Sequence, residues 1–256
     1  MRIEGMVKRF GGLTAVDQVD LAIPAGRLCG LIGANGAGKT TLFNLITGIE
    51  APTNGKVFFR DRELTGLKME DRAAAGIIRT FQRTRLFLSM TVLENVMAGM
   101  ALHFRNGALD ALVRPRRVRN DEAEARRLAV ALVHLVGLAG REFEPCRNLP
   151  YGHRRLVELA RALAARPAVL LLDEPAAGLN HEERQHLQGL IRRLRDEFGL
   201  TIVLVEHHLS LVLQTCDRVV VLHHGRKIAE DVPGRIVQND QVIEAYLGTR
   251  RRVLDA

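Results

Sequence analysis

Aromatic residues are scarce in this sequence. It contains no tryptophan and two tyrosines, and aromatic residues make up 4% of its 256 positions. The net charge is +8, and basic surfaces attract nucleic acid or anionic lipid. Proteins that bind single-stranded nucleic acid usually stack bases on aromatic side chains, however. We therefore expect no direct nucleic-acid binding, and we expect the arginines to form solvated helix faces.

Long apolar runs and paired cysteines are also missing. No stretch of about 18 apolar residues occurs, so no membrane-spanning helix is expected. The first residues lack the apolar centre of a signal peptide. The three cysteines, Cys29, Cys146 and Cys216, are widely spaced and form no C-x-x-C pair. This usage is typical of buried thiols in a reducing compartment, so we expect a cytoplasmic protein without disulfides.

A glycine-rich stretch stands out against these absences. Residues 33–40 match the phosphate-loop pattern G-x-x-x-x-G-K-[ST]. They lie between an apolar run at 28–32, expected to be a strand, and an expected helix at 41–47. Glycines let several backbone N–H groups point at one anion, and the helix N-terminus adds partial positive charge. Lys39 can reach the outer phosphates and Thr40 can offer a hydroxyl to Mg²⁺. The residues expected to hold the phosphates are Gly33, Asn35, Gly36, Ala37, Gly38, Lys39, Thr40 and Thr41.

Two acids follow a second apolar run. Residues 168–172 are expected to form a buried strand, which places Asp173 and Glu174 at its carboxyl end, where ligands bind in open α/β sheets. Asp173 suits Mg²⁺, with Thr40 as the second ligand. Glu174 suits the role of general base for an attacking water. A phosphate-loop kinase has no obvious need for the second acid, so Glu174 favours hydrolysis.

Two further polar residues follow expected strands. Gln82 comes after the apolar piece at 77–78 and could contact Mg²⁺ and the attacking water, although a lone glutamine is also typical of a surface amide. His207 follows the apolar run 201–205 and could contact the γ-phosphate, although a lone histidine is more often structural. The histidine pairs at 207–208 and 223–224 suggest a metal, but adjacent strand residues point to opposite faces, so no histidine metal site is expected.

The hydrophobic pattern predicts an α/β fold with a mostly parallel sheet. Continuous apolar runs at 168–172 and 201–205, joined by a helix at 182–198, are typical of parallel strands covered on both faces. Antiparallel strands are expected near the N-terminus, at 2–8, 16–23 and 56–60 with turns at 52–55 and 61–62, and in a hairpin at 218–222 and 226–229. Helices are expected at 91–97, capped by Thr91 and Glu94, and at 120–136, 154–165 and 242–248.

These elements predict one domain over residues 1–256. Its nucleotide-binding core comprises 1–82 and 166–256 and includes the antiparallel β layer, and 83–165 form a mostly helical insertion. The basic segment 104–120 is expected to be a surface loop. In the helix at 120–136, five residues are expected to face inward: Leu128, Leu132, Val133, Leu135 and Val136.

Together these features resemble the ATP-binding cassette (ABC) ATPases of membrane transporters over nearly the whole chain. Residues 33–41 resemble the family's Walker A loop, 80–82 its Q-loop, 173–175 the end of its Walker B motif and 177–180 its D-loop. His207 resembles the switch histidine, and Phe10 stands where the family has an adenine-stacking aromatic. The resemblance implies a P-loop NTPase fold, with ATP and Mg²⁺ as cofactors and with Glu174, Gln82 and His207 as catalytic residues.

The stretch at 149–153, Leu-Pro-Tyr-Gly-His, resembles the family signature L-S-G-G-Q but departs from it. The pair Tyr151 and Gly152 is similar to the variant found in branched-chain amino-acid transport ATPases, as are the segments 79–87, 175–180 and 245–248. Pro150 removes a backbone N–H and a hydroxyl relative to the usual serine. The resemblance implies that Tyr151 and Gly152 contact nucleotide held by a second cassette.

The resemblance implies a transport-coupled ATPase on the cytoplasmic face of the cell membrane. Its expected partners are two transmembrane permease subunits, a second identical or homologous ABC ATPase subunit and an extracytoplasmic solute-binding protein. The implied cargo is a branched-chain or other hydrophobic amino acid, taken up into the cell. A soluble cassette ATPase acting on DNA or ribosomes is the alternative, but such proteins usually carry two cassettes or long coiled-coil insertions. A small-molecule kinase would leave Gln82, His207 and the signature helix unexplained.

Overall fold

A computed structural model describes residues 1–82, 85–101, 116–206 and 209–245, with the side chains of 116–120 excepted. The chain forms two compact units. The first contains Met1–Arg79, Val169–Pro175 and Ile191–Ala256, and the second contains Thr80–Ala168 and Ala176–Leu190. Within the described ranges, no helix is long and apolar enough to cross a bilayer.

The second unit is larger than the insertion expected from the sequence, because residues 176–190 belong to it as well. Two close approaches connect residues 176–190 to the rest of the second unit. The Nε2 atom of His186 lies 3.3 Å from the carbonyl oxygen of Val136. A Cβ atom on Gly178 would lie 2.9 Å from the ring of Tyr151. The first half of the helix that begins at His181 therefore packs with the helical unit.

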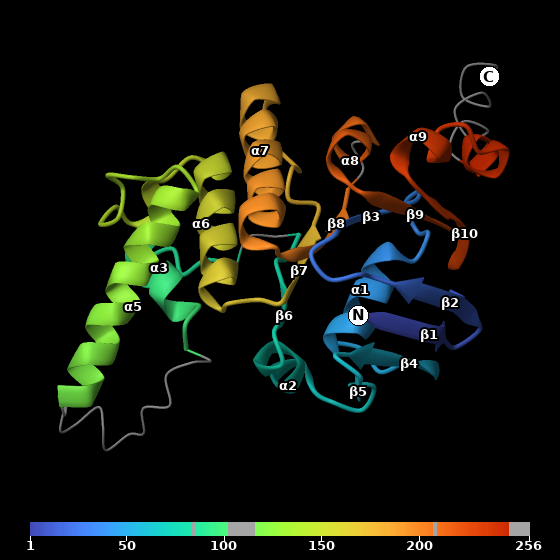
Figure 1. Ribbon diagram of the computed structural model, residues 1–256, viewed down its shortest axis with the longest axis horizontal. Coiled ribbons are helices and arrows are strands. Elements are labelled where there is room, and N and C mark those ends of the chain that lie inside the picture. The colour runs from blue at the N-terminus through green and yellow to red at the C-terminus, as the bar shows by residue number, and fades with distance from the viewer. Residues whose placement is uncertain (83–84, 102–115, 207–208, 246–256) are drawn as a thin grey trace. The chain divides into compact units, whose positions relative to one another are not determined.

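A six-stranded sheet forms the centre of the first unit, in the order β10-β9-β3-β8-β7-β6 (Figure 1). All neighbouring pairs are parallel except β9 and β10, which form the expected hairpin. The strands β3, β7 and β8 are buried along their whole length, as their apolar runs predict. The strands are β3 (Leu28–Ile32), β6 (Ile77–Arg79), β7 (Val169–Asp173), β8 (Thr201–Val205), β9 (Arg218–His223) and β10 (Arg226–Asp231). The predicted mostly parallel sheet is confirmed.

A second, antiparallel sheet of the same unit has the order β2-β1-β4-β5. Its strands are β1 (Arg2–Phe10), β2 (Leu13–Ala22), β4 (Asn54–Phe59) and β5 (Arg62–Glu63). The turn predicted at 52–55 is partly wrong, because Asn54 and Gly55 already belong to β4. Gly55 has φ 95°, and a Cβ atom there would lie 2.5 Å from the carbonyl oxygen of Gly5 in β1. The glycine therefore allows two strands to approach closely.

The helices of the first unit include three that sequence periodicity does not predict. These are α2 (Met69–Ala74), α8 (Leu209–Thr215) and α9 (Pro233–Ile236), each too short to show a helical repeat. Arg72 of α2 is 1% exposed and donates to the carbonyl oxygens of Leu45 and Ile46, at the end of α1 (Lys39–Thr47). The predicted C-terminal helix begins at residue 240, and its end lies outside the described residues.

The helices α3 (Val92–Ala98), α5 (Arg116–Leu135) and α6 (Tyr151–Ala164) pack together in the second unit (Figure 1). The predicted capping box is confirmed, with Thr91 and Glu94 bonded reciprocally at the start of α3. α5 begins at Arg116, so the end of the expected surface loop 104–120 is helical, while residues 102–115 lie outside the described residues. α6 begins at Tyr151, which places Gly152 inside its first turn.

The buried face of α5 differs from the expected one. Val133 and the following Val136 are fully buried as predicted, but Leu128, Leu132 and Leu135 are only half-buried. Two alanines of the same helix, Ala125 and Ala129, are deeply buried. Small side chains thus occupy the closest part of the helix contact, and the larger leucines lie at its margin.

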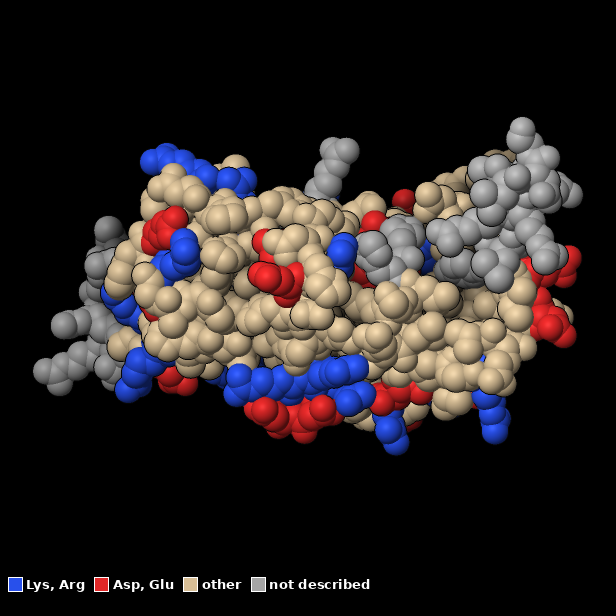
Figure 2. Space-filling view, turned by 90° about the horizontal axis from the view of Figure 1, so that it is seen from above, with Lys and Arg blue, Asp and Glu red and all other residues tan. Residues whose placement is uncertain are grey.

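Basic and acidic side chains are interspersed on the face drawn in Figure 2. In the C-terminal half of α7 (His181–Phe198), the exposed side chains of Arg193 and Glu197 form an ion pair of 2.8 Å. Arg195 pairs with Asp196 at 2.7 Å and with Asp217 at the same distance. The exposed Arg193 fits the expected solvated helix face, whereas Arg195 is half-buried against Asp217.

Candidate functional site

The glycine-rich loop is fixed by the backbone around it. Gly36 and Gly38 have left-handed φ values of 78° and 99°, and Gly38 directly precedes α1. A Cβ atom on Gly33 would lie 2.3 Å from the carbonyl oxygen of Leu222, and one on Gly38 would lie 2.5 Å from that of Ala15. These approaches leave no room for a side chain at either position. The loop therefore takes one conformation, set by β2 and by the end of β9.

Lys39 lies within this loop and close to the two acids. Its residue is 5% exposed, and its Nζ atom donates to the carbonyl oxygens of Gly33 at 2.7 Å and Ala34 at 2.9 Å. Burial lowers the pKa of Lys39, while the charges of Glu174 and Asp173 oppose this shift. The ammonium group thus closes the loop on itself. Asn35, Gly36 and Thr40 are exposed at the surface of the loop.

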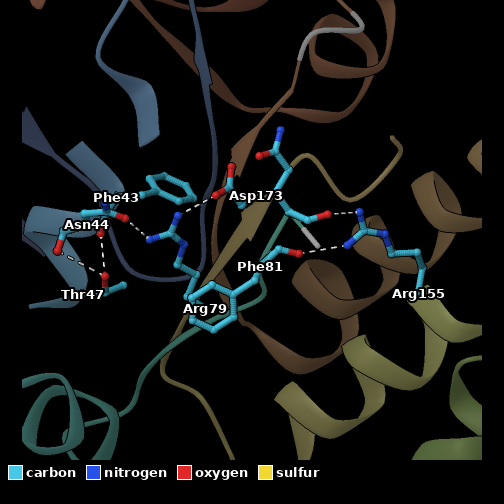
Figure 3. Close-up of polar contacts among 8 residues, drawn as sticks. Phe43, Asn44, Thr47, Arg79, Phe81, Arg155 and Asp173 are labelled. Atoms are coloured by element: carbon cyan, nitrogen blue, oxygen red, sulfur yellow. Dashed lines mark hydrogen bonds and ion pairs between the residues drawn. The ribbon is translucent and has the colours of Figure 1, made fainter. Parts of the chain in front are cut away.

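Asp173 ends β7 as expected and is 2% exposed. Its Oδ2 atom accepts a hydrogen bond of 2.6 Å from Nη2 of Arg79, the last residue of β6 (Figure 3). The Oδ1 atom is buried and has no hydrogen-bond partner among the described residues. An unpartnered buried carboxylate oxygen is a suitable ligand for Mg²⁺, directly or through water, and the exposed Thr40 can add its hydroxyl. The residues present therefore fit this cation.

Arg79 is a site residue that motif reasoning missed. Its side chain is 6% exposed, donates at 2.6 Å to Oδ1 of Asn44 in α1, and lies over the ring of Phe43 (Figure 3). Arg79 thus links α1 to Asp173. The sequence contained one signal for this residue, because a basic residue follows the short apolar piece at 77–78. It did not show which strand would lie beside that piece.

Glu174 is buried and follows β7 in a left-handed conformation with φ 49°. Its backbone N–H donates to the carbonyl oxygen of Val205, at the end of β8. Such a conformation costs a non-glycine residue about 1–3 kcal/mol and tends to occur at functional sites. The strain lies at the residue that the sequence predicts as the general base.

The signature stretch lies in the second unit, at the start of α6. Pro150 is the N-cap residue, with φ −55°, and contributes no side-chain cap. A Cβ atom on Gly152 would lie 2.2 Å from Oε1 of Glu183. Glu183 and Asn180 in turn bond reciprocally, each backbone N–H to the other side chain at 2.9 Å, at the start of α7. A side chain at 152 would therefore displace the carboxylate of Glu183, which belongs to the same unit.

Gln82 and Arg155 meet in the same unit. The backbone carbonyl oxygens of Phe81 and Gln82 accept hydrogen bonds from the Arg155 guanidinium (Figure 3). Sequence reasoning assigned no role to Arg155, because its partners lie more than 70 positions away. His207, the predicted switch histidine, lies outside the described residues.

Two other predicted positions lie in the first unit. Phe10 ends β1 with 45% of its surface exposed, and the Nζ atom of Lys8 lies 4.7 Å from the ring centroid. An exposed aromatic ring is suited to stacking on a base. The rings of His223 and His224 do not point apart as expected but lie 4.1 Å apart. His224 is not a strand residue: it lies in the β9–β10 turn with φ 46°.

Comparison with known proteins places these features in a family. The model of the ABC transporter family matches residues 16–177, and that of the branched-chain amino acid ATP-binding cassette transporter matches 226–251. The chain is 40% identical to the high-affinity branched-chain amino acid transport ATP-binding protein LivG of Escherichia coli K12 over 248 residues, covering 97% of each chain. Its match to BraF of Pseudomonas aeruginosa has the same identity and coverage.

Solved structures of cassettes agree with the sequence comparison. The ADP conformation of MJ1267, an ATP-binding cassette of an ABC transporter, superposes with a TM-score of 0.83 at 30% identity, covering 96% of this chain and 98% of that one. The dimeric post-hydrolysis state of the cassette MJ0796, bound to ADP and Pi, superposes with a TM-score of 0.77 at 25% identity, covering 91% and 98%. The chain therefore belongs to the ABC transporter family and is one of its ATP-hydrolysing cassettes.

Proposed function

We propose that this cassette drives the import of branched-chain or related hydrophobic amino acids. The observation that carries the proposal is the match over 97% of the chain to relatives named for high-affinity branched-chain amino acid transport. The match at 226–251 to the cassette model of that transport class supports it independently. A soluble cassette acting on DNA or ribosomes is not favoured, because these full-length relatives are transport proteins.

The roles of the residues in the first unit follow from their chemistry. The loop N–H groups and Lys39 hold the phosphates of ATP, and Phe10 stacks on the adenine. Thr40 and Asp173 hold Mg²⁺, and Gln82 is proposed as a further ligand that also contacts the attacking water. Mg²⁺, when bound by these residues, would neutralise the negative charge that develops on the phosphates during hydrolysis. Glu174 accepts a proton from the attacking water, and the strained backbone at this residue fixes the carboxylate's direction.

A second cassette completes the site in this proposal. Tyr151 and Gly152, at the N-terminus of α6, meet ATP held by a partner cassette arranged head-to-tail, where the helix dipole favours an anion. His207 contacts the γ-phosphate. ATP would hold the pair closed and hydrolysis would release it, a population shift driven by nucleotide. The dimeric solved state of MJ0796 with ADP and Pi supports this arrangement.

The other proposed partners are two transmembrane permease subunits and an extracytoplasmic solute-binding protein. The cassette would lie on the cytoplasmic face of the membrane, joined to the permeases. We further propose that residues 1–256 act as a single ABC ATPase domain in which the helical part transmits the nucleotide state to the permeases.

Glu174→Gln is the first test of this function. The variant keeps the size of the side chain but cannot take a proton, so hydrolysis should stop while ATP still drives dimer formation in size-exclusion chromatography. Glu122→Gln, an exposed residue of α5, is the matched control and should hydrolyse ATP at the wild-type rate. Undiminished steady-state hydrolysis by Glu174→Gln would contradict the assigned base.

A second test addresses the cargo. The cassette is reconstituted with its permease subunits in proteoliposomes containing MgATP, and uptake of radiolabelled leucine is compared with that of urea and of an acyclic amide. We expect leucine uptake that depends on ATP and is lost with Glu174→Gln. Uptake of the amide or urea instead of leucine would reassign the solute, and co-purification with nucleic acid rather than permeases would refute transport.

A further inference from the structure

The second unit contains a buried arginine whose hydrogen bonds go beyond what an ion pair requires. The side chain of Arg155, in α6, is 4% exposed and pairs with Glu158, which is buried equally well, at 3.1 Å. Nη1 also donates to the carbonyl oxygen of Phe81 at 2.9 Å, and Nη2 donates to that of Gln82 (Figure 3). Nε donates to the hydroxyl oxygen of Tyr151 at 3.1 Å. One guanidinium therefore joins four residues.

The partners of Arg155 belong to segments that sequence motifs single out for contact with ATP. Gln82 is the proposed ligand of Mg²⁺ and water, and Tyr151 opens the signature helix. The ring of Tyr151 also contacts the loop 176–180, because a Cβ atom on Gly178 would lie 2.9 Å from its Cε1 atom. Arg155 thus connects residues 81–82 with the start of α6, and Tyr151 connects the start of α6 with the loop 176–180, all within one unit.

The geometry depends on the shape of the guanidinium. Two successive carbonyl oxygens are met by two nitrogens of one planar fork, which a lysine ammonium cannot reproduce. Burial raises the pKa of Glu158, and the charge of Arg155 together with a hydrogen bond from the Phe81 backbone opposes this rise. The Glu158 carboxylate therefore interacts with the Phe81 backbone as well as with the Arg155 guanidinium.

We propose that Arg155 is a positioning residue that makes the backbone of Phe81 and Gln82 move together with the signature helix α6. When α6 closes on ATP of a partner cassette, the peptide segment that carries Gln82 then follows in the same motion. This inference rests on the proposed role of Gln82 in hydrolysis. The hydrogen bonds of Arg155 go to residues of its own unit, so in this proposal it acts through Gln82 and not on ATP itself.

Arg155→Lys is the test, because it keeps the positive charge beside Glu158 and removes the fork. We expect kcat to fall between about tenfold and a hundredfold, as small misplacements of catalytic groups do. The affinity of the isolated cassette for a fluorescent ATP analogue should stay within about twofold of wild type, as for substitutions outside a binding site. Arg127→Lys, an exposed arginine of α5, is the matched control and should change neither quantity.

Hydrogen–deuterium exchange distinguishes positioning from general loss of structure. In Arg155→Lys, exchange should rise in peptides covering residues 79–82, while peptides covering 33–41 keep the wild-type rate. Tyr151→Phe removes one acceptor of Arg155 and should lower kcat by a smaller factor, which tests the network even if the lysine variant does not fold. Wild-type kcat in both variants, or a loss of nucleotide affinity in step with kcat, would overturn the proposal.

Failure of this inference is distinguishable from failure of the proposed function. If Arg155 does not position Gln82, wild-type hydrolysis and its block by Glu174→Gln remain. If the proposed function is wrong, the wild-type cassette itself shows no hydrolysis that depends on Glu174.

Discussion

Two helices of this protein begin at motifs expected to face ATP phosphates, and they are built in different ways. The loop before α1 carries its own cation, Lys39, and its glycines lie against neighbouring backbone that leaves no room for side chains. The start of α6 presents Pro150 and a half-exposed Tyr151, with the carboxylate of Glu183 against Gly152.

The cations near the start of α6 are engaged by carbonyl oxygens. Arg154 donates to those of Leu149 and Arg147, and Arg155 to those of Phe81 and Gln82. The α1 motif is thus equipped to bind phosphate, whereas the α6 motif offers backbone and a helix dipole and commits its arginines to internal positioning. We therefore expect the α1 motif to bind nucleotide strongly. We expect the α6 motif to contact nucleotide that a partner cassette already holds.

The largest effect is expected on the unfolding free energy, from breaking the buried ion pair of Arg79 and Asp173 next to α1. Arg79→Leu leaves the Asp173 carboxylate buried without its guanidinium, and breaking a buried pair in this way costs about 3–5 kcal/mol of unfolding free energy. Urea denaturation should show this loss, and the double variant with Asp173→Asn should recover part of it. Arg193→Leu, from an exposed pair, is the control and should change stability by less than about 0.5 kcal/mol. An unchanged urea midpoint for Arg79→Leu would show that the stability of the first unit does not depend on this ion pair.

A smaller effect is expected from removing the cation of the α1 motif. Lys39→Met should weaken binding of a fluorescent ATP analogue by about 1.5–3 kcal/mol, the range for hydrogen bonds to charged groups. Lys56→Met, an exposed lysine of β4, should bind as wild type does. Equal affinities for Lys39→Met and wild type would show that the α1 motif does not bind nucleotide through its own cation, which is the proposed difference from the α6 motif.

The smallest effect is expected from making the α6 motif more like its usual form. Pro150→Ser would supply a side-chain cap worth about 0.5–2 kcal/mol, part of which is offset by about 0.4–1 kcal/mol from the greater freedom of the unfolded chain. We expect a melting temperature raised by a few degrees or less and a kcat no lower than wild type. A marked loss of kcat would mean that the rigid proline itself is needed to set the start of α6.

Local patterns in the sequence were sufficient to predict the phosphate loop, the strand that ends in Asp173, and the capping box of Thr91. Each is a contiguous run in which glycine, charge or apolar spacing carries the information. The mostly parallel sheet could be predicted for the same reason, since strands covered on both faces have uninterrupted apolar runs. The short helices α2, α8 and α9 could not, because fewer than two turns show no clear period.

The sequence by itself therefore determined the phosphate-loop motif and the position of the two acids at the end of β7. Only the tertiary structure decided how these parts are held, because that depends on which segments become neighbours. Arg79 meets Asp173 across 94 positions, since β6 is placed beside β7. Arg155 meets Phe81 across 74 positions, and the carboxylate of Glu183 lies against Gly152. Such contacts join residues far apart in the chain, and neither periodicity nor a motif in one segment records the partner supplied by another.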